Sequence, residues 1–225
     1  MAGPVNGRLF DIYDRLYSAY GPQHWWPGDS AFEIIAGAIL TQSAAWSNVE
    51  RALANLKAAG ALSPQGIAAL SEEELAGLIR PSGYYNAKAR KLKAFVRLLD
   101  ECAGGDLPPL LALPATELRS LLLATHGLGP ETADSILLYA AGRPVFVIDA
   151  YTRRTFSRLG LAPEMDSYAS WQGQFSDALP PDARMFNEYH ALVVRHGKQA
   201  CRKRPLCHGC PLAVICPTGI AAKAA

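Results

Sequence analysis

Four cysteines near the end of the 225-residue chain lie close enough in sequence to hold one metal group. Cys201, Cys207, Cys210 and Cys216 form a C-x5-C-x2-C-x5-C array. Two disulfides among them would close very short loops, and the N-terminus lacks the continuous apolar core of a secretion signal. Zinc more often takes two C-x-x-C knuckles, so one C-x-x-C flanked by single cysteines at equal distances favours a 4Fe-4S cluster over zinc.

Basic residues gather in three segments, although the formal net charge of the chain is only +2. They occupy residues 88–93, Arg153 with Arg154, and residues 195–204. Each segment alone is typical of a solvated helix or loop face. A second interpretation is an electrostatic footprint, in which Arg153 and Lys203, the latter inside the cysteine array, contact nucleic-acid phosphates.

A glycine-containing turn separates two apolar helical patterns at residues 125–133. Gly127 and Gly129 permit a tight turn, and Pro130 suits an early position of the second helix. Backbone N–H groups of such a turn and of first-turn residues such as Thr132 would bind a phosphate oxygen, supported by the helix dipole. The pattern therefore predicts either a phosphate grip or an ordinary interhelical turn.

One carboxylate beyond this turn is a candidate for catalysis. Asp149 follows the apolar residues 145–148 and precedes a polar helical start, which predicts a helix N-cap. An aspartate near a helix N-terminus also stays ionised, as a group that stabilises a cationic transition state must. Both roles are open at this level.

The elements that must position these residues are predicted to be helices. Apolar residues recur with helical period, for example Phe32, Ile35 and Ile39. Pro, Gly and Ser punctuation divides the chain into roughly ten helices, and Ser71 with Glu74 has capping-box spacing. Half of the residues are hydrophobic and 19% are charged, which excludes a disordered or collagen-like chain. We therefore expect an all-α protein with a substantial core.

The order of these features resembles the endonuclease III superfamily of helix-hairpin-helix DNA glycosylases. The resemblance rests on four segments: the glycine-containing turn, the Asp149 segment, residues 189–197 and the cysteine array. It implies two helical domains: a six-helix barrel with the hairpin at residues 23–133, and a 4Fe-4S cluster domain formed by residues 1–22 and 134–225. It also implies that double-stranded DNA is the partner and that a damaged base is flipped into a cleft. The first cysteine spacing is one residue shorter than in endonuclease III itself, and the resemblance still implies the cluster.

Glu131 departs from part of that superfamily. Bifunctional members carry a lysine at this position of the hairpin helix, because an amine attacks C1′, forms a Schiff base and leads to strand cleavage. A carboxylate cannot form that intermediate. The resemblance thus implies a monofunctional glycosylase, in which Asp149 stabilises an oxocarbenium-like sugar, helps water to attack and leaves an abasic site.

Four segments are most similar to the 3-methyladenine DNA glycosylase III branch, namely residues 25–28, 37–46, 80–90 and 127–134. This similarity implies that the substrate is an alkylated purine. Such a base is cationic, so stacking on Trp26 or Trp46 would add about 0.5 to 2 kcal/mol of cation–π attraction that normal adenine lacks.

The same similarity assigns residues to the base and to DNA. The implied base-pocket residues are Trp25, Trp26, Pro27, Trp46 and Glu131. Gln42 would fill the gap left by the flipped base, and Tyr84 and Tyr85 would lie near DNA. Each residue has a plainer alternative, since tryptophans also fill cores, Gln42 and the tyrosines also suit solvated or packed loops, and Glu131 also suits the helix dipole.

Other functions stay open. The same scaffold would also accept deaminated, oxidised or mismatched bases, because a few side chains decide the pocket. A third hypothesis is a helix-hairpin-helix DNA-binding protein without catalysis. The presence of Asp149 argues against this hypothesis, because binding a phosphate through backbone N–H groups requires no carboxylate. No apolar stretch reaches the roughly 18 residues of a membrane helix, so we expect a cytoplasmic protein with no membrane partner. If DNA is its partner, it would be associated with the nucleoid. We expect a monomer, because one protein that spans one lesion needs no symmetry.

Overall fold

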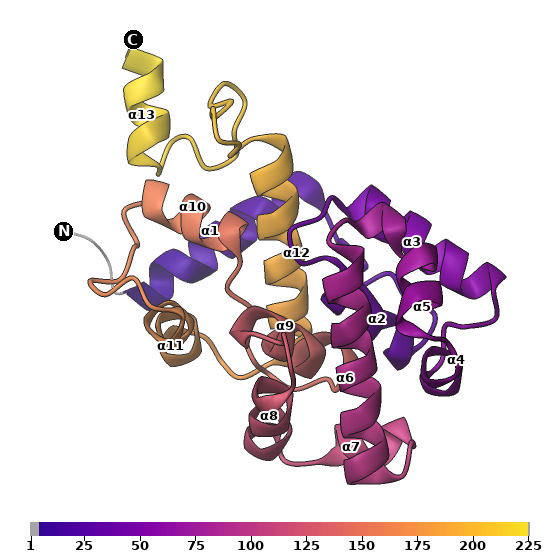
Figure 1. The fold of residues 1–225 in the computed structure, drawn as a ribbon. Coiled ribbons are helices and arrows are strands. Elements are labelled where there is room, and N and C mark those ends of the chain that lie inside the picture. Colours follow the sequence, from indigo (N-terminus) through magenta and orange to yellow (C-terminus); the bar gives the residue numbers. More distant parts are fainter. Residues whose placement is uncertain (1–4, 225) are drawn as a thin grey trace. The chain divides into compact units, whose positions relative to one another are not determined.

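The computed structural model describes residues 5–224, and this part of the chain consists of helices and loops without a β-strand (Figure 1). The expected all-helical class is confirmed. The chain forms two compact units. The end unit contains Met1–Trp25 and Pro144–Ala225, and the middle unit contains Trp26–Arg143. Among the described residues, no helix is both long and apolar enough to cross a membrane.

The second boundary between the units lies later than residue 133. Helix α9 (Pro130–Ser135) runs directly into the π-helical turn η2 (Ile136–Ala140), and η2 packs on α2 (Ala31–Leu40) of the middle unit. Ile136 and Leu137 of this turn are completely buried. A division at residue 133 would expose these side chains, so the middle unit continues to Arg143.

The middle unit is a set of helices with serine caps. The Ser71 hydroxyl accepts the Glu74 N–H while the Glu74 carboxylate accepts the Ser71 N–H at 2.8 Å, so the expected capping box is confirmed. Ser30 caps α2 in a similar way by accepting the Glu33 N–H. The remaining elements of the unit are α3 (Trp46–Ala58), α4 (Pro64–Ala69), α5 (Glu72–Leu78), η1 (Arg80–Ser82), α6 (Tyr85–Ala103), α7 (Leu107–Ala112) and α8 (Ala115–Ala124).

A buried lysine joins three of these elements. Lys88 of α6 is 1% exposed, and its ammonium donates to the carbonyl oxygens of Leu40 at 2.8 Å and Ser82 at 2.6 Å. Burial, with a smaller contribution from the nearby Lys91, lowers the pKa of Lys88 to about 8. The side chain is therefore still mostly protonated at neutral pH and ties the end of α2 to η1.

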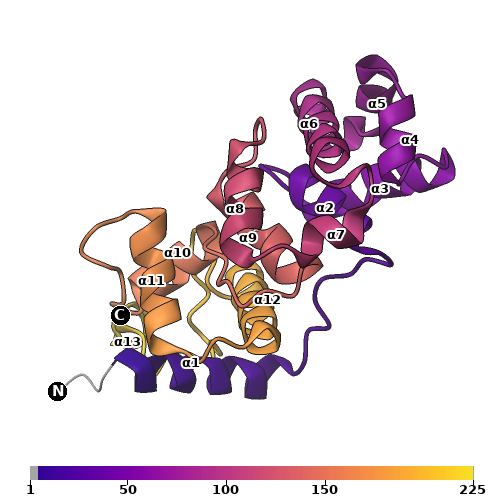
Figure 2. The same cartoon turned by 90° about the horizontal axis from the view of Figure 1, so that it is seen from below.

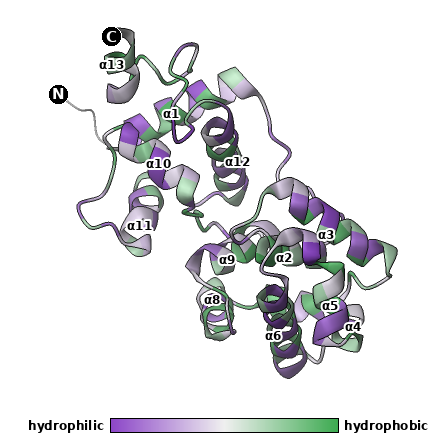
Figure 3. Ribbon diagram, turned by 45° about the horizontal axis from the view of Figure 1, so that its top comes forward, coloured by the Kyte–Doolittle hydropathy of each residue, from purple (hydrophilic) through white to green (hydrophobic). Residues whose placement is uncertain are grey.

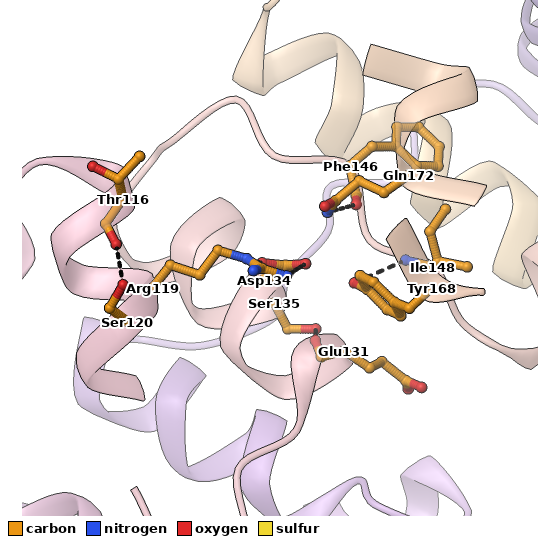
Figure 4. A network of polar contacts seen from close by, with 10 residues as sticks. All are labelled: Thr116, Arg119, Ser120, Glu131, Asp134, Ser135, Phe146, Ile148, Tyr168 and Gln172. Carbon is orange, nitrogen blue, oxygen red and sulfur yellow. Dashed lines mark hydrogen bonds and ion pairs between the residues drawn. The ribbon is translucent and has the colours of Figure 1, made fainter. Parts of the chain in front are cut away.

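A buried ion pair fixes α8 against α9. Asp134 is fully buried, and Arg119 donates to its two carboxylate oxygens from Nε at 2.7 Å and from Nη2 at 3.2 Å (Figure 4). The two hydrogen bonds from one guanidinium compensate for the removal of the carboxylate from water. This contact holds the two helices that flank the glycine-containing turn.

The end unit has an aromatic core. It consists of α1 (Val5–Tyr20), α10 (Ala150–Arg158), α11 (Tyr168–Ala178), α12 (Ala183–Gln199) and α13 (Pro217–Ala224). Helices α1 and α12 lie side by side although they come from opposite ends of the chain (Figures 1 and 2). The Tyr189 hydroxyl of α12 donates to the Leu9 carbonyl of α1 at 2.8 Å. The rings that meet in this core belong to Phe146, Phe156, Phe175, Phe186 and Tyr189.

Amphipathic α12 also packs closely on α10. Hydrophilic and hydrophobic residues are both present around α12 (Figure 3). At Gly197 a Cβ atom would lie 2.5 Å from Cδ1 of Tyr151, so only glycine allows this approach. Arg154 of α10 donates from Nη2 to the Gly197 carbonyl at 3.0 Å. The start of α10, where Asp149 lies, is thereby held on a rigid support.

Candidate functional site

The glycine-containing turn has the conformation expected of a tight hairpin. Gly127 adopts φ +79°, and the Leu128 N–H closes the turn on the Thr125 carbonyl at 3.1 Å. Gly129 has an extended backbone with φ −91°, so it does not use the left-handed region, and Pro130 begins α9. Within residues 5–224 the N–H groups of Gly127 and Gly129 have no hydrogen-bond partner. The turn therefore offers backbone donors beside a helix N-terminus.

Gln42 is bound to this turn. Its Nε2 donates to the Thr132 hydroxyl at 2.9 Å and to the Gly127 carbonyl at 3.3 Å, while Lys91 Nζ donates to its Oε1. Thus Gln42, Gly127 and Thr132, three residues predicted to meet DNA, lie together in the middle unit. Sequence reasoning missed Lys91 as their partner, because its only signal was membership of a basic segment.

Three aromatic side chains form a cluster in the middle unit. The Trp26 ring meets Trp46 edge to face, with centroids 5.2 Å apart and an interplanar angle of 88°. It also lies 5.1 Å from the Tyr139 ring. At Gly37 a Cβ atom would come within 3.2 Å of the Trp26 ring, so this glycine gives the ring room on α2. Sequence reasoning did not include Tyr139, because it lies within an apolar helical run.

Trp25 directly precedes the cluster residue Trp26 in the chain. It belongs to the end unit, where Lys198 Nζ lies 6.0 Å from the centroid of its ring. Pro27 is exposed in the loop before α2. The pocket roles of Trp25 and Pro27 stay predictions.

Asp149 in the end unit has the expected N-cap geometry. Its Oδ1 accepts the Thr152 N–H at 2.7 Å at the start of α10. The extended segment before it is held by α11, because Gln172 donates to the Phe146 carbonyl at 2.9 Å and Ile148 donates its N–H to the Tyr168 hydroxyl at 3.4 Å (Figure 4). The carboxylate is thus anchored from its helix and from the preceding backbone.

The second oxygen of Asp149 faces a histidine. His190 Nε2 lies 3.6 Å from Oδ2, and His190 is 5% exposed. Burial lowers the pKa of His190, and the Asp149 carboxylate opposes this shift only in part. The imidazole is therefore neutral at pH 7, so it contacts Asp149 without cancelling its negative charge. Sequence reasoning missed His190, since one polar residue in an apolar helix gives no specific signal.

Comparison with known proteins identifies the group to which these features belong. Residues 36–181 match the family model described as HhH-GPD superfamily base excision DNA repair protein. A protein of Methanocaldococcus jannaschii named as a candidate DNA repair glycosylase is 44% identical over 92% of this chain and 95% of its own length. This chain belongs to the HhH-GPD superfamily. It is a DNA glycosylase of base excision repair, as the sequence resemblance implied.

Solved structures agree with this assignment. The Helicobacter pylori 3-methyladenine DNA glycosylase bound to 1,N6-ethenoadenine is 28% identical, with a TM-score of 0.72 over 85% of this chain and 97% of that one. A noncovalent endonuclease III–DNA complex has a TM-score of 0.84 over the whole of both chains. At 22% identity it supports the fold alone. The expected two-domain endonuclease III fold is confirmed.

Two neighbouring tyrosines of the glycosylase differ in exposure. Tyr85 is half-buried, and the Arg80 guanidinium lies 5.8 Å from the centroid of its ring. Tyr84 is 75% exposed and adopts φ +46°, which is unusual for a residue with a side chain. The exposed ring at this position is therefore Tyr84, and the better-packed one is Tyr85.

The predicted charged contacts also have defined surroundings. Glu131 lies exposed in the first turn of α9, and its carboxylate extends away from that helix (Figure 4). Arg153 forms an ion pair with Asp166 and lies 5.8 Å from the centroid of the Trp171 ring. Lys203 is exposed, and its carbonyl accepts a hydrogen bond from Arg158. Arg153 would have to exchange Asp166 for a phosphate in order to bind DNA.

The four cysteines come together in the loop after α12. Cys201, Cys207, Cys210 and Cys216 are free thiols that line one cavity. Burial raises the pKa of Cys210, and the three other cysteines raise it further. Arg158 Nη1 donates to Cys201 Sγ at 3.2 Å, so a cation adjoins the sulfurs. Among the described residues, no group of three or more His, Cys, Asp or Glu side chains is arranged to hold a metal ion.

Proposed function

We propose that this glycosylase is monofunctional and hydrolyses the N-glycosidic bond of alkylated purines such as 3-methyladenine. The Trp26, Trp46 and Tyr139 cluster carries the proposal. The faces of these rings attract a cationic base, whereas a neutral base gains only ordinary stacking. Similarity to the Helicobacter pylori 3-methyladenine glycosylase supports the same substrate class.

Asp149 is the proposed catalytic residue. As the bond between C1′ and the base nitrogen breaks, its electron pair leaves with the base and the sugar becomes positively charged. The Asp149 carboxylate stabilises that charge, and the water that adds to C1′ transfers a proton to it. An alkylated purine already carries positive charge, so its departure does not need a strong general acid.

The carboxylate side chain of Glu131 is the reason to expect no strand cleavage by this glycosylase. Cleavage by this superfamily through a Schiff base requires an amine at C1′, and a carboxylate cannot supply one. The product of the reaction is then an abasic site in an intact strand. The hairpin turn would hold a phosphate of the duplex through the N–H groups of Gly127 and Gly129, which have no hydrogen-bond partner in the described part of the chain.

The cysteine loop is the proposed 4Fe-4S site. Cys201, Cys207, Cys210 and Cys216 would hold the cluster, which supplies a covalent brace for the loop when bound. The support for this proposal is that the four cysteines line one cavity and that Arg158 donates to Cys201, although the described side chains are not arranged around a metal position. Iron and sulfide analysis of the purified protein tests this site. About four of each per chain supports the cluster, and a single zinc ion contradicts it.

One experiment separates the proposed activity from its competitors. The purified protein is incubated with methylated duplex DNA and, separately, with duplexes that contain uracil, thymine glycol or a G·T mismatch. Released bases and strand breaks are measured before and after alkali, for the unmodified protein and for Asp149→Asn.

The proposal is supported if the unmodified protein releases 3-methyladenine, strand breaks appear only after alkali, and Asp149→Asn releases no base. Release only from the neutral-lesion duplexes would reassign the substrate. Breaks without alkali would contradict the interpretation of Glu131. Unchanged release by Asp149→Asn would remove Asp149 from catalysis.

A further inference from the structure

The side chain of Gln42 is held at both ends of its amide group. The nitrogen end donates to Thr132 and to the Gly127 carbonyl, at 2.9 and 3.3 Å. The oxygen end accepts from Lys91 Nζ. Four segments of the middle unit thus meet at one side chain: the end of α2, α6, the hairpin turn and α9.

We propose that Lys91 is a positioning residue that sets the orientation of the Gln42 amide for entry into DNA. The inference rests on the proposed function and on the role that the family resemblance implies for Gln42, which is to fill the gap left by the flipped base. A carboxamide rotated by half a turn would keep its shape but exchange its oxygen and its NH2 group. Lys91 would then face a donor, and the Gly127 carbonyl would face an oxygen. The lysine ammonium therefore selects one of the two orientations.

The position of Lys91 itself depends on the hairpin. A Cβ atom at Gly127 would lie 2.6 Å from Cγ and Cε of Lys91, so the lysine stem passes directly over this glycine. Gly127 thereby gives room to Lys91, while its carbonyl accepts from the Gln42 amide. The turn that would hold phosphate and the side chain that would enter the duplex are coupled through one lysine.

This arrangement also decides what Gln42 can offer to a base. A primary amide has two N–H donors and two acceptor sites on its oxygen. The donors are directed to the Gly127 carbonyl in the hairpin turn and to the Thr132 hydroxyl in α9, and one acceptor site is used by Lys91. While the network persists, Gln42 presents its remaining oxygen lone pair, so it is matched to a base-edge donor.

A matched lysine on the same helix provides the control. Lys93 Nζ donates to the carbonyls of Ala68 and Leu70, and within the described part of the chain it forms no hydrogen bond with Gln42. Lys91→Met and Lys93→Met remove the same charge from α6. Lys91→Arg keeps a donor, and Gln42→Ala removes the amide.

The first test measures affinity for a duplex with a tetrahydrofuran abasic-site analogue, which contains no base to identify. We expect Lys91→Met to weaken this binding about tenfold, with no further loss when it is added to Gln42→Ala. Affinity for undamaged duplex should stay unchanged, Lys93→Met should leave both affinities within about twofold, and Lys91→Arg should restore most of the lost binding.

The second test observes Gln42 without DNA. The side-chain NH2 signal of Gln42 in ¹⁵N NMR spectra is identified by its loss in Gln42→Ala. Lys91→Met should shift that signal and speed its hydrogen exchange, whereas Lys93→Met should not. An unchanged signal in Lys91→Met would overturn the inference even if the variant bound DNA poorly.

A direct phosphate contact by Lys91 would give a different result. The losses from Lys91→Met and Gln42→Ala would then add, undamaged duplex would also bind more weakly, and the salt dependence of binding would fall by about one unit. That outcome overturns the positioning role. The proposed function can also fail separately. If the protein releases no methylated purine but the effects of Lys91→Met and Gln42→Ala on binding are still not additive, the proposed function is contradicted and the positioning role of Lys91 is not.

Discussion

The two carboxylate oxygens of Asp149 make different contacts. Oδ1 accepts the Thr152 N–H at 2.7 Å and so fixes the side chain as a helix cap. Oδ2 faces the buried, neutral His190 at 3.6 Å. An N-cap is therefore not an alternative to a catalytic role for this residue. It is the contact that would hold a catalytic carboxylate in place at the N-terminus of α10.

Gly127 and Gly129 are predicted to respond differently to the same substitution. Gly127→Ala forces a side chain into φ +79° and against the Lys91 stem, so we expect a loss of about 1 to 2 kcal/mol in the free energy of unfolding. Gly129 has φ −91° and no atom within 4 Å of an added Cβ. Gly129→Ala should therefore change stability by less than about 0.5 kcal/mol.

Urea unfolding of the two variants and the parent protein measures these changes. An equal loss in both variants would contradict the assignment of the left-handed conformation to Gly127 alone.

At the scale of elements, short helices divide the chain more finely than the expected ten or so. The structure has thirteen α-helices within residues 5–224. Pro64 begins the six-residue α4, and Pro108 lies in the first turn of the six-residue α7. Proline is tolerated in a first turn, where its missing N–H costs nothing, so these prolines begin short helices as well as separating long ones.

The contact between α10 and α12 predicts a second pair of unequal glycine substitutions. Gly197→Ala adds a methyl group 2.5 Å from the Tyr151 ring and must move the helices apart. We expect a net loss of about 2 kcal/mol, because overpacking outweighs the better helix propensity of alanine. Gly77 of α5 has no atom within 4 Å of an added Cβ, so Gly77→Ala should gain about 0.5 kcal/mol.

Thermal and urea unfolding of both variants provide the comparison. Increased stability of Gly197→Ala would show that the two helices separate without cost, contrary to the packing described above.

At the scale of the whole molecule, stability should depend on the protonation of His190. Its pKa in the folded protein is lowered by burial, whereas an unfolded histidine titrates near about 6.5. Between these two values the unfolded chain binds more protons than the folded protein, so the free energy of unfolding rises with pH. The folded protein should accordingly lose stability as pH falls below about 6.5.

His190→Gln isolates this contribution. The free energy of unfolding is measured between pH 5 and 8 for the parent protein and the variant, and we expect their difference to shrink as the solution becomes more acidic. His126→Gln, which removes an exposed imidazole, is the control variant. A difference between parent and His190→Gln that does not vary with pH would contradict the burial effect.

Short-range features of this protein were determined by its sequence. The all-helical class, the Ser71 capping box, the Asp149 cap and the tight turn at Gly127 depend on contacts between residues a few positions apart. Such contacts follow from side-chain type and spacing, because the backbone between the partners allows few conformations. The family resemblance rests on the same short segments, which is why it was recognisable without a structure.

Long-range contacts were decided only by the tertiary structure. Tyr139 joins Trp26, His190 meets Asp149, and Lys91 holds Gln42, although no local pattern connects the members of these pairs. The end of the middle unit at Arg143 likewise depends on the packing of η2 on α2. Each of these contacts depends on how whole helices bury their apolar faces, and that choice is made by the complete core rather than by any single segment.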